Sequence, residues 1–373
     1  MKDFIRIVTR PERSARQNLA VWAGAALLAV LAGAAFIALM GRNPLEVYGM
    51  ILKGAFVGSR RNPFSAVQAT VIKFIPLLTV TLGLTLAFQM RFWNIGGEGQ
   101  MMMGAIFASF FALNTPGLPH LPLMLVMALA GILGGGLWAL IPALCKVKIG
   151  VNEVLFTLMM NYVAQYTIVY LQSGPWQRTP GFASVGSFDA NVRLAKLFGI
   201  HAGWVVALVL TVLVWVYLRH TKQGYELRVV GESHATARYA GMRLGPVVLR
   251  TMFLSGGICG LAGMVQVAGI DHTLSTGVTG GVGFTGITLA WLAQLNPAAI
   301  AAISGVFSIL EKGSGSIPPA VMASDAADVL QSILLFSFLI CEFFRRYEIR
   351  IKKPEKNVET HGSASPAEQE VAP

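Results

Sequence analysis

The feature that most constrains this chain is the length of its uncharged apolar runs. Residues 19–40 carry no charge, and as an α-helix they would be about 33 Å long, enough to cross the ~30 Å hydrocarbon core of a bilayer. Over the whole sequence 54% of residues are hydrophobic and only 13% are charged, and the mean hydropathy is +0.62. These values lie outside the usual range of soluble domains. The sequence therefore predicts a membrane protein.

Further uncharged runs set the number of membrane segments. Two of them, 99–145 and 272–310, are too long for one helix each. The first is interrupted by NTPGLPHLP at 114–122 and the second by LNP at 295–297, and proline ends or kinks a helix because it lacks a backbone N–H. We therefore expect an all-α, polytopic membrane helix bundle with about ten transmembrane segments. The remaining runs are 74–90, 154–177, 197–218, 251–270 and 329–341, the last of which begins beside Asp325 and Asp328.

The distribution of basic residues predicts the orientation of the bundle. With both termini in the cytoplasm, 20 Lys and Arg residues lie on the cytoplasmic side and 8 on the opposite side, as the positive-inside rule requires. The chain then divides into a cytoplasmic segment (1–18), a transmembrane domain (19–344) with a cytoplasmic loop (219–250), and a cytoplasmic tail (345–373). We expect the polar, aromatic-free part of this tail after Lys353 to be disordered. The net charge of +11 follows from this topology and implies no nucleic-acid partner.

Several kinds of site are not supported by the motifs. No Gly-Lys dipeptide occurs, so the chain has no phosphate-binding loop of the GxxxxGK[ST] type. A GxGxxG pattern at Gly281, Gly283 and Gly286 lies inside an uncharged run without a preceding strand pattern, and we interpret it as unwound or closely packed backbone. Two GxxxG spacings, at 131–135 and 256–260, predict tight helix contacts. The six histidines and three cysteines show no metal-binding spacing, so we expect the chain itself to bind no metal and no cofactor.

The sequence RFWNIGGEGQ (91–100) places a carboxylate among glycines between two apolar runs. A charge at mid-membrane costs about 2.5 to 3.5 kcal/mol on insertion scales, so Glu98 should face a partner or a cavity and not lipid. One interpretation is a residue at the water interface that pairs with Arg91 and caps the next helix. The other is that irregular backbone borders a water-filled path, in which case Asn94, Glu98 and Gln100 line a substrate route.

A second polar cluster lies in the sequence GVNEVLFTLMMNYVAQY. Asn161 and Gln165 share a helix face by their i, i+4 spacing, and Glu153 and Thr157 form a similar pair. This stripe either lines the same route or makes the interhelical hydrogen bonds that hold the bundle together. A third candidate is Gln294, beside LNP, where a broken helix would present backbone groups to a cargo.

The longest cytoplasmic loop (219–250) is too polar to span and too patterned for a loose linker. Within it, SHATARYAGM begins with Ser233, a favoured N-cap residue, and reaches Gly241, a helix stop signal. A short helix on the cytoplasmic face suits docking to another protein. A surface helix without a partner is the alternative.

Three stretches together resemble the permease subunits of binding-protein-dependent ABC importers, in the branch that carries sugars and nucleosides. They are FWNIGGEGQ, GVNEVLFTLMMNY and GYELRVVGESHATARYAGM, and the resemblance extends over residues 43–344. It is greatest to the nucleoside-type permeases. The chain departs from the family pattern at Trp93, where Phe is frequent, at Gly97, where Ala is frequent, and at Ser233-His234, where Asn-Pro is common.

The resemblance implies an architecture similar to that of the vitamin B12 permease, in the bacterial cytoplasmic (inner) membrane. Besides membrane lipid it implies three partners: a second permease subunit of the same family, an ABC ATPase whose two nucleotide-binding domains hold ATP and Mg²⁺, and an external substrate-binding lipoprotein. Gly231, Glu232, Arg238 and Gly241 match the family's coupling segment, which sits in a groove of the ATPase. We therefore expect ATP binding by the partner to pull on a helix at 232–241 and to switch the bundle between outward and inward access.

We accordingly interpret the chain as a transport subunit without an ATPase site of its own, carrying a nucleoside or related sugar-containing solute. A permease for a simple sugar, such as a pentose or hexose, remains open, because amide and carboxylate groups beside aromatic residues suit either cargo. The alternative from another class is an ion-coupled secondary transporter, with Glu98 or Asp271 carrying a proton. No filter pattern favours a channel, and no nucleophile with a base favours an enzyme. The expected substrate pathway comprises Asn94, Glu98, Gln100, Asn161, Gln165 and Gln294.

Overall fold

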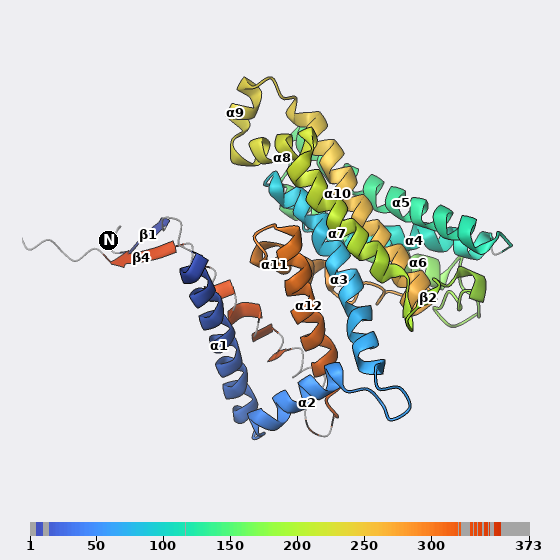
Figure 1. Ribbon diagram of the computed structural model, residues 1–373. Helices are drawn as coiled ribbons and strands as arrows, with labels where there is room; N and C mark the ends of the chain where they lie inside the picture. Colours follow the sequence, from blue (N-terminus) through green and yellow to red (C-terminus); the bar gives the residue numbers. More distant parts are fainter. Residues whose placement is uncertain are drawn as a thin grey trace, which may run out of the picture.

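The computed structural model describes residues 5–9, 15–115, 117–319, 321 and 347–351, together with 329–343 except 331, 334, 338 and 342 (Figure 1). Most of these residues are helical. The part of the tail that we expect to be disordered lies outside the described residues, as do Asp325 and Asp328 before the last segment.

Of the described helices, five are by themselves long and apolar enough to cross a membrane. They are α3 (Ser65–Gln89), α5 (His120–Ile149), α6 (Glu153–Ser173), α7 (Gly203–His220) and α10 (Leu244–Gln266), which a π-helical turn, η2 (Val267–Asp271), extends. Packed among them are α4 (Gly97–Asn114), α11 (Val282–Leu292) and α12 (Pro297–Ser314). With α1 (Ala15–Leu39) and the helical residues of 329–343 they confirm the expected polytopic membrane bundle.

Both helix breaks predicted from proline lie where the sequence puts them. α4 ends at Asn114 and α5 begins at His120, so the break lies within the proline-rich stretch 114–122. α11 ends before LNP, and α12 begins at Pro297. Asn296 caps α12, because its Oδ1 accepts a hydrogen bond from the backbone N–H of Ala298 at 3.1 Å. Proline fits the first helical position because its missing N–H needs no partner there.

A sharp bend separates α1 from the helix that follows it. The apolar part of α1, Leu27–Leu39, and α2 (Pro44–Phe56) meet at 115°, so α2 lies across the end of α1 (Figure 1). Gly41 takes a left-handed φ of 73° at the corner, which glycine adopts without steric cost. Asn43 then starts α2 by accepting the N–H of Leu45 at 3.1 Å.

The tightly packed centre of the bundle consists of α3, α4, α5 and α10. Every residue of α3 from Ile75 to Phe88 is buried. The contacts predicted from the GxxxG spacings are confirmed: a Cβ on Gly135 would overlap the carbonyl of Gly256, and one on Gly260 would overlap the carbonyl of Gly131. Glycines therefore let the α5 and α10 backbones touch, as membrane helices do where side chains are small.

The cytoplasmic loop predicted at 219–250 folds into two short helices, α8 (Lys222–Glu232) and α9 (His234–Tyr239), at one end of the bundle (Figure 1). We call this the α9 end. The short helix predicted between Ser233 and Gly241 is present as α9, whereas Glu232, which we expected at its start, is the last residue of α8. The predicted N-cap is confirmed, since Ser233 Oγ accepts the N–H of Thr236 at 3.2 Å, and Gly241 ends the segment with a φ of 74°.

The segment before α7 differs from the expected membrane run at 197–218. α7 begins only at Gly203, and a two-stranded ribbon precedes it. Phe198 and Gly199 have φ values of 56° and 80°, the left-handed pair that a tight hairpin turn needs. The ribbon lies at the end of the bundle opposite the α9 end (Figure 1). Its strands are β2 (Lys196–Leu197) and β3 (Ile200–His201), preceded by the 3₁₀ turn η1 (Ala190–Val192).

A second ribbon joins the two ends of the chain. β1 (Ile5–Thr9) pairs antiparallel with β4 (Tyr347–Ile351), and the pair lies at the start of α1 (Figure 1). An even number of membrane crossings puts both chain ends on one side, so this pairing agrees with about ten segments. Among the described residues, the two ribbons are the departures from an all-α chain.

Candidate functional site

Directly after α3 the chain turns back into the bundle. Arg91 takes a left-handed φ of 55°, and Asn94 closes a turn in which its Oδ1 accepts the N–H of Gly96 at 3.0 Å. The side chains of Asn94 and Gln100 are buried and bond each other twice, Nδ2 to Oε1 at 3.1 Å and Nε2 to Oδ1 at 2.9 Å. Each of these two amides therefore satisfies the other and fixes the turn.

Two side chains of α6 hold this turn in place. Thr157 Oγ1 accepts the N–H of Ile95 at 3.1 Å. Asn161 Nδ2 donates to the carbonyl of Ile95 at 2.9 Å, and Asn161 Oδ1 accepts the N–H of Gly99 at 2.9 Å. Irregular backbone inside a membrane needs such partners because lipid offers none. This part of the polar stripe on α6 thus makes interhelical hydrogen bonds, one of its two expected roles.

Glu98 reaches across to the start of α11. Its Oε1 accepts the N–H of Gly281 at 3.0 Å and its Oε2 accepts the N–H of Gly283 at 2.6 Å. A Cβ on Gly283 would overlap the Glu98 backbone, so only glycine allows this approach. An anion at a helix N-terminus is favourable because the helix dipole leaves partial positive charge there. Glu98 is therefore a tertiary cap of α11, made from another helix 183 or more residues away.

α11 is a half-length helix that begins inside the bundle. Near its start, Gly286 lies against Thr81 of α3, and near its end Trp291 contacts Phe88. α11 therefore runs beside only the half of α3 that is nearer the α9 end. Gly281 takes a φ of 79° at its N-cap, which confirms the interpretation of the GxGxxG glycines as unwound, closely packed backbone.

A cavity of about 230 Å³ opens beside this capped helix start. Glu98 lines it from the first turn of α4 and Asn161 lines it from α6, and Gln165 lies one turn further along α6. Thr276 from the irregular segment before α11 and Phe284 from α11 complete this part of the lining, and both are exposed. Three of the expected pathway residues, Glu98, Asn161 and Gln165, thus meet at one cavity, whereas Asn94 and Gln100 are enclosed behind it.

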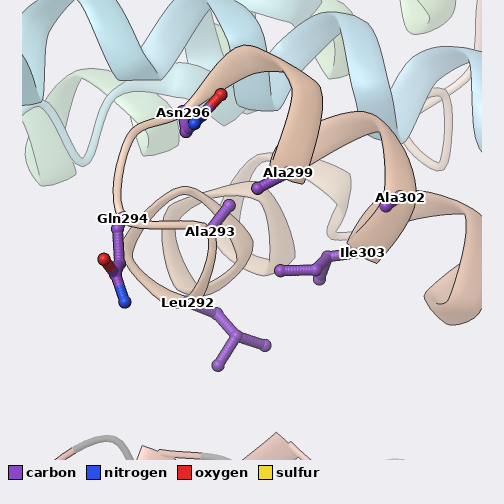
Figure 2. A pocket seen from close by; sticks show the side chains of 7 residues that line it. All are labelled: Leu292, Ala293, Gln294, Asn296, Ala299, Ala302 and Ile303. Carbon is purple, nitrogen blue, oxygen red and sulfur yellow. The ribbon is translucent and has the colours of Figure 1, made fainter. Parts of the chain in front are cut away.

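Gln294 lies at a different cavity, of about 480 Å³, in the turn between α11 and α12 (Figure 2). Its side chain and that of Asn296 leave the turn in different directions (Figure 2). Gln294 and Leu295 have φ values of 53° and 58°, an uncommon conformation for residues other than glycine. The carbonyl of Leu295 accepts a hydrogen bond from Gln89 Nε2 at 3.3 Å, so this turn is fastened to the end of α3.

The α8 helix packs against the same end of α3. Gly231 is buried, and a Cβ there would overlap the carbonyl of Gln89. Glu226 of α8 also forms an ion pair with Arg250 of α10 at 3.0 Å. A displacement of α8 must therefore move α3 or α10, because close-packed backbones have no free space between them.

The outer face of the α8 and α9 pair is open. Ala237 is buried against the bundle, whereas Glu232 and Arg238 are exposed, and Tyr239 is almost completely exposed. The expected coupling residues therefore divide between two places. Glu232, Arg238 and Gly241 are at the surface, and Gly231 is at the contact with α3.

Comparison with known proteins assigns the chain. Residues 66–339 match the family described as the permease component of the branched-chain amino acid transport system. The chain belongs to this family of transport permeases.

The permease is also similar to individual ABC transporter subunits. It is 30% identical to the glucose ABC transporter permease protein TsgB13 of Haloferax volcanii, over 91% of its own chain and 93% of the relative. It is 29% identical to the guanosine ABC transporter permease protein NupP of Bacillus subtilis, over 78% and 86% of the two chains. A solved metal-chelate type ABC transporter in an inward-facing conformation is 15% identical and covers 79% of the permease and 96% of that chain, with a TM-score of 0.40. The resemblance drawn from the sequence motifs is confirmed by the family and by the first two relatives.

Sequence reasoning overlooked a row of tyrosines in the permease. Tyr162, Tyr166 and Tyr170 are exposed, and their i, i+4, i+8 spacing puts them on one face of α6. Tyr162 also lines the cavity beside Glu98. The spacing is visible in the sequence, where Asn161 and Gln165 each directly precede a tyrosine.

Proposed function

We propose that this permease forms part of the translocation path of an ABC importer for a nucleoside or related sugar-containing solute, driven by a separate ATPase. The observation that carries the proposal is the contact of Gly231 with Gln89. It connects an exposed docking element, α8 with α9, to the buried helix at the centre of the bundle. Such a connection is what a transport subunit worked from one side of the membrane requires.

The same contact gives a path for the driving motion. A force on α9 reaches α8, and the Gly231 contact passes it to the last turn of α3. Gln89 in that turn also holds the carbonyl of Leu295, so the turn between α11 and α12 moves as well. α11 carries the cavity lining at its other end. ATP binding by the partner would thus switch access to the cavity through rigid elements.

Three partners complete the importer. An ABC ATPase, whose two nucleotide-binding domains hold ATP and Mg²⁺, docks at the α9 end, which faces the cytoplasm together with both termini. A second permease subunit of the same family covers the face that exposes Tyr162, because an aromatic side chain with a polar hydroxyl is poorly placed in the middle of lipid. An external substrate-binding lipoprotein delivers the solute at the opposite end. The assembly lies in the bacterial inner membrane.

The lining of the cavity supports a nucleoside as cargo. The rings of Tyr162 and Phe284 offer flat surfaces for a base, and stacking of a base on an aromatic ring contributes about 1–3 kcal/mol. Gln165 and Thr276 supply neutral hydrogen-bonding groups for ribose hydroxyls. The relative NupP is named as a guanosine permease, which favours the same class.

A simple sugar is the second candidate. TsgB13, named as a glucose permease, is 30% identical to this chain and matches 91% of it. Hydroxyl groups of a hexose would use the same glutamine, threonine and tyrosine side chains, and its apolar ring face would pack on Phe284.

The test is uptake by the complete importer in liposomes that contain ATP. The vesicles hold both permease subunits and the ATPase, the binding protein is added outside, and labelled guanosine and labelled glucose are compared. We expect ATP-dependent accumulation of guanosine that persists when a proton gradient is collapsed. Accumulation of glucose alone would establish the second candidate.

Two outcomes would contradict the proposal. One is accumulation that survives the removal of ATP and stops with the proton gradient, as a secondary transporter with Glu98 or Asp271 as proton carrier requires. The other is accumulation against a gradient by this chain without its ATPase.

A further inference from the structure

We infer that Glu98 determines the charge selectivity of the cavity, admitting neutral solutes and excluding anionic ones such as the phosphorylated forms of nucleosides and sugars. The inference deepens the proposed function and rests on it, since it takes the cavity to be part of the cargo route. It follows from the hydrogen bonds that Glu98 accepts at the start of α11.

A helix that begins inside a membrane bundle would ordinarily attract an anion. Its first backbone N–H groups have no partner within the helix, and its dipole adds partial positive charge. Broken membrane helices present such ends to anionic groups of their substrates. In this permease a cargo phosphate or carboxylate would be expected at the start of α11 if that end were open.

The start of α11 is already occupied by the protein. Glu98 accepts the N–H groups of Gly281 and Gly283, and the N–H of Val282 donates to the carbonyl of Thr279 at 3.0 Å. The next two N–H groups, of residues 284 and 285, donate to the carbonyl of Gly281. The donors that an incoming anion would use are therefore taken.

The charge of the cavity follows from the same contacts. A carboxylate whose two oxygens both accept N–H groups is in its acceptor-only, ionised form. It contributes a full negative charge, whereas the helix end contributes about half a positive charge. Among the described residues that line the cavity, Glu98 is the only charged one. The cavity is thus net negative, which disfavours each negative charge of a solute by about tenfold at a separation near 6 Å.

The remaining lining suits a neutral hydroxylated solute. Gln165 and Thr276 present an amide and a hydroxyl that donate and accept without charge. Tyr162 and Phe284 add aromatic surface that is exposed to the cavity. Phosphorylated metabolites, which share the base and sugar of the cargo, would meet the same contacts and be rejected by charge alone.

The test measures the electrostatic potential of the cavity in the assembled importer. Thr276, which is exposed at the cavity, is replaced by cysteine in a chain that also carries Cys145→Ser and Cys341→Ser. Cys259 is fully buried and stays. The complex in lipid nanodiscs is treated with a cationic (trimethylammonium) and an anionic (sulfonate) ethyl methanethiosulfonate, and each rate is divided by the rate of that reagent with a free thiol.

We expect the cationic reagent to react about tenfold or more faster than the anionic one, because a net negative cavity attracts the first and repels the second. Glu98→Gln should bring the ratio to one or below, because the amide has no charge and the start of α11 keeps its partial positive charge. Glu153→Gln is the matched control: it removes a carboxylate of α6 that pairs with Lys146 and not with α11, and it should leave the ratio unchanged.

A second pair of variants leaves the cap of α11 intact. Gln165→Lys places a positive charge beside Glu98 and should abolish or reverse the preference, whereas Gln165→Met, of similar length and uncharged, should retain it. A ratio near one in the Thr276→Cys parent, or a ratio that neither Glu98→Gln nor Gln165→Lys changes, would overturn the inference. Either result could coexist with normal guanosine uptake, so it is distinguishable from failure of the proposed function.

Discussion

Trp93, in the turn after α3, stacks on Trp291 of α11, with ring centroids 5.1 Å apart and an interplanar angle of 21°. Phe88 of α3 contacts both rings, at centroid distances of 6.1 and 5.6 Å. Three elements therefore meet in one aromatic cluster near the α9 end. Phe88 is buried and Trp93 is 45% exposed, so the cluster extends from the core to the surface.

Trp93→Ala should lower the initial rate of ATP-driven uptake about two- to tenfold at an unchanged amount of protein in the membrane. An aromatic pair contributes about 0.5–1.5 kcal/mol beyond its buried area, and here that energy joins the moving turn to α11. Trp93→Phe, which introduces the residue frequent in the family, is the matched control and should keep most of the rate. The rate is measured per permease molecule in proteoliposomes. Equal rates for the wild type and Trp93→Ala would show that the stack does not transmit motion.

Gly231→Pro should leave membrane insertion intact and abolish coupled uptake. A side chain at this position overlaps the carbonyl of Gln89, so α8 must move away from α3, and proline also disturbs the last turn of α8. The control is Gly49→Ala in α2, where a Cβ would meet nothing within 4 Å. Uptake and ATP hydrolysis are measured on the same vesicles, and we expect hydrolysis to persist without transport. Unchanged uptake in Gly231→Pro would count against the coupling role of α8.

Asn94→Leu should destabilise the folded permease by about 1–3 kcal/mol, because it leaves the buried amide of Gln100 without its partner. The measurement is the thermal midpoint of the purified protein, and the control is Gln165→Leu, which changes an exposed amide. The Michaelis constant for cargo should stay the same in molecules of Asn94→Leu that do fold. A large change in the Michaelis constant with an unaltered thermal midpoint would instead show that Asn94 contacts the cargo, as the sequence analysis expected.

The local features of this fold were predictable because each depends on residues close together in the sequence. Prolines at 114–122 and 295–297 end helices by removing an N–H. Ser233 caps α9 through a contact three residues away. The glycine spacings at 131–135 and 256–260 predicted close contacts, although only the structure pairs one with the other. The helix α8 before Ser233 was not predicted, so Glu232, its last residue, was assigned to the following helix.

The sequence predicted which residues belong to the site, but it did not predict which groups they contact. Glu98 was singled out because an isolated charge in an apolar chain needs a partner. The partner is the start of a helix more than 180 residues further along the chain. Because almost every residue has a backbone N–H, the sequence does not indicate which of them Glu98 binds. For the same reason the enclosure of Asn94 and Gln100 could not be separated in advance from exposure to a path. An amide side chain can be enclosed in the protein or exposed to a path, and its type does not tell the two apart.

His201 offers a test of the ribbon at the other end of the bundle. It is only 3% exposed, and neither ring nitrogen has a hydrogen-bond partner among the described residues. A Cβ on Gly269 of η2 would lie 2.6 Å from its Nδ1, so the ring packs directly on the π-helical turn. Burial, together with the nearby charges of His272 and Lys196, lowers the pKa of His201 from its ordinary 6.5 to about 4.

The lowered pKa of His201 predicts loss of stability in acid. In the unfolded chain the imidazole takes up its proton near pH 6.5, whereas in the folded protein it does so only near pH 4, so the unfolded state binds more protons between these values. The stability that His201 contributes as a neutral ring is fully present above pH 6.5 and falls, by up to about 3 kcal/mol, as the pH drops to 4. His201→Phe keeps a ring of similar size without a titrating group and should show a smaller fall in thermal midpoint between pH 7 and pH 4.5. His234→Phe, on the exposed surface of α9, is the control and should follow the wild type. If His201→Phe loses as much stability in acid as the wild type, burial of this imidazole does not govern the acid sensitivity of the fold.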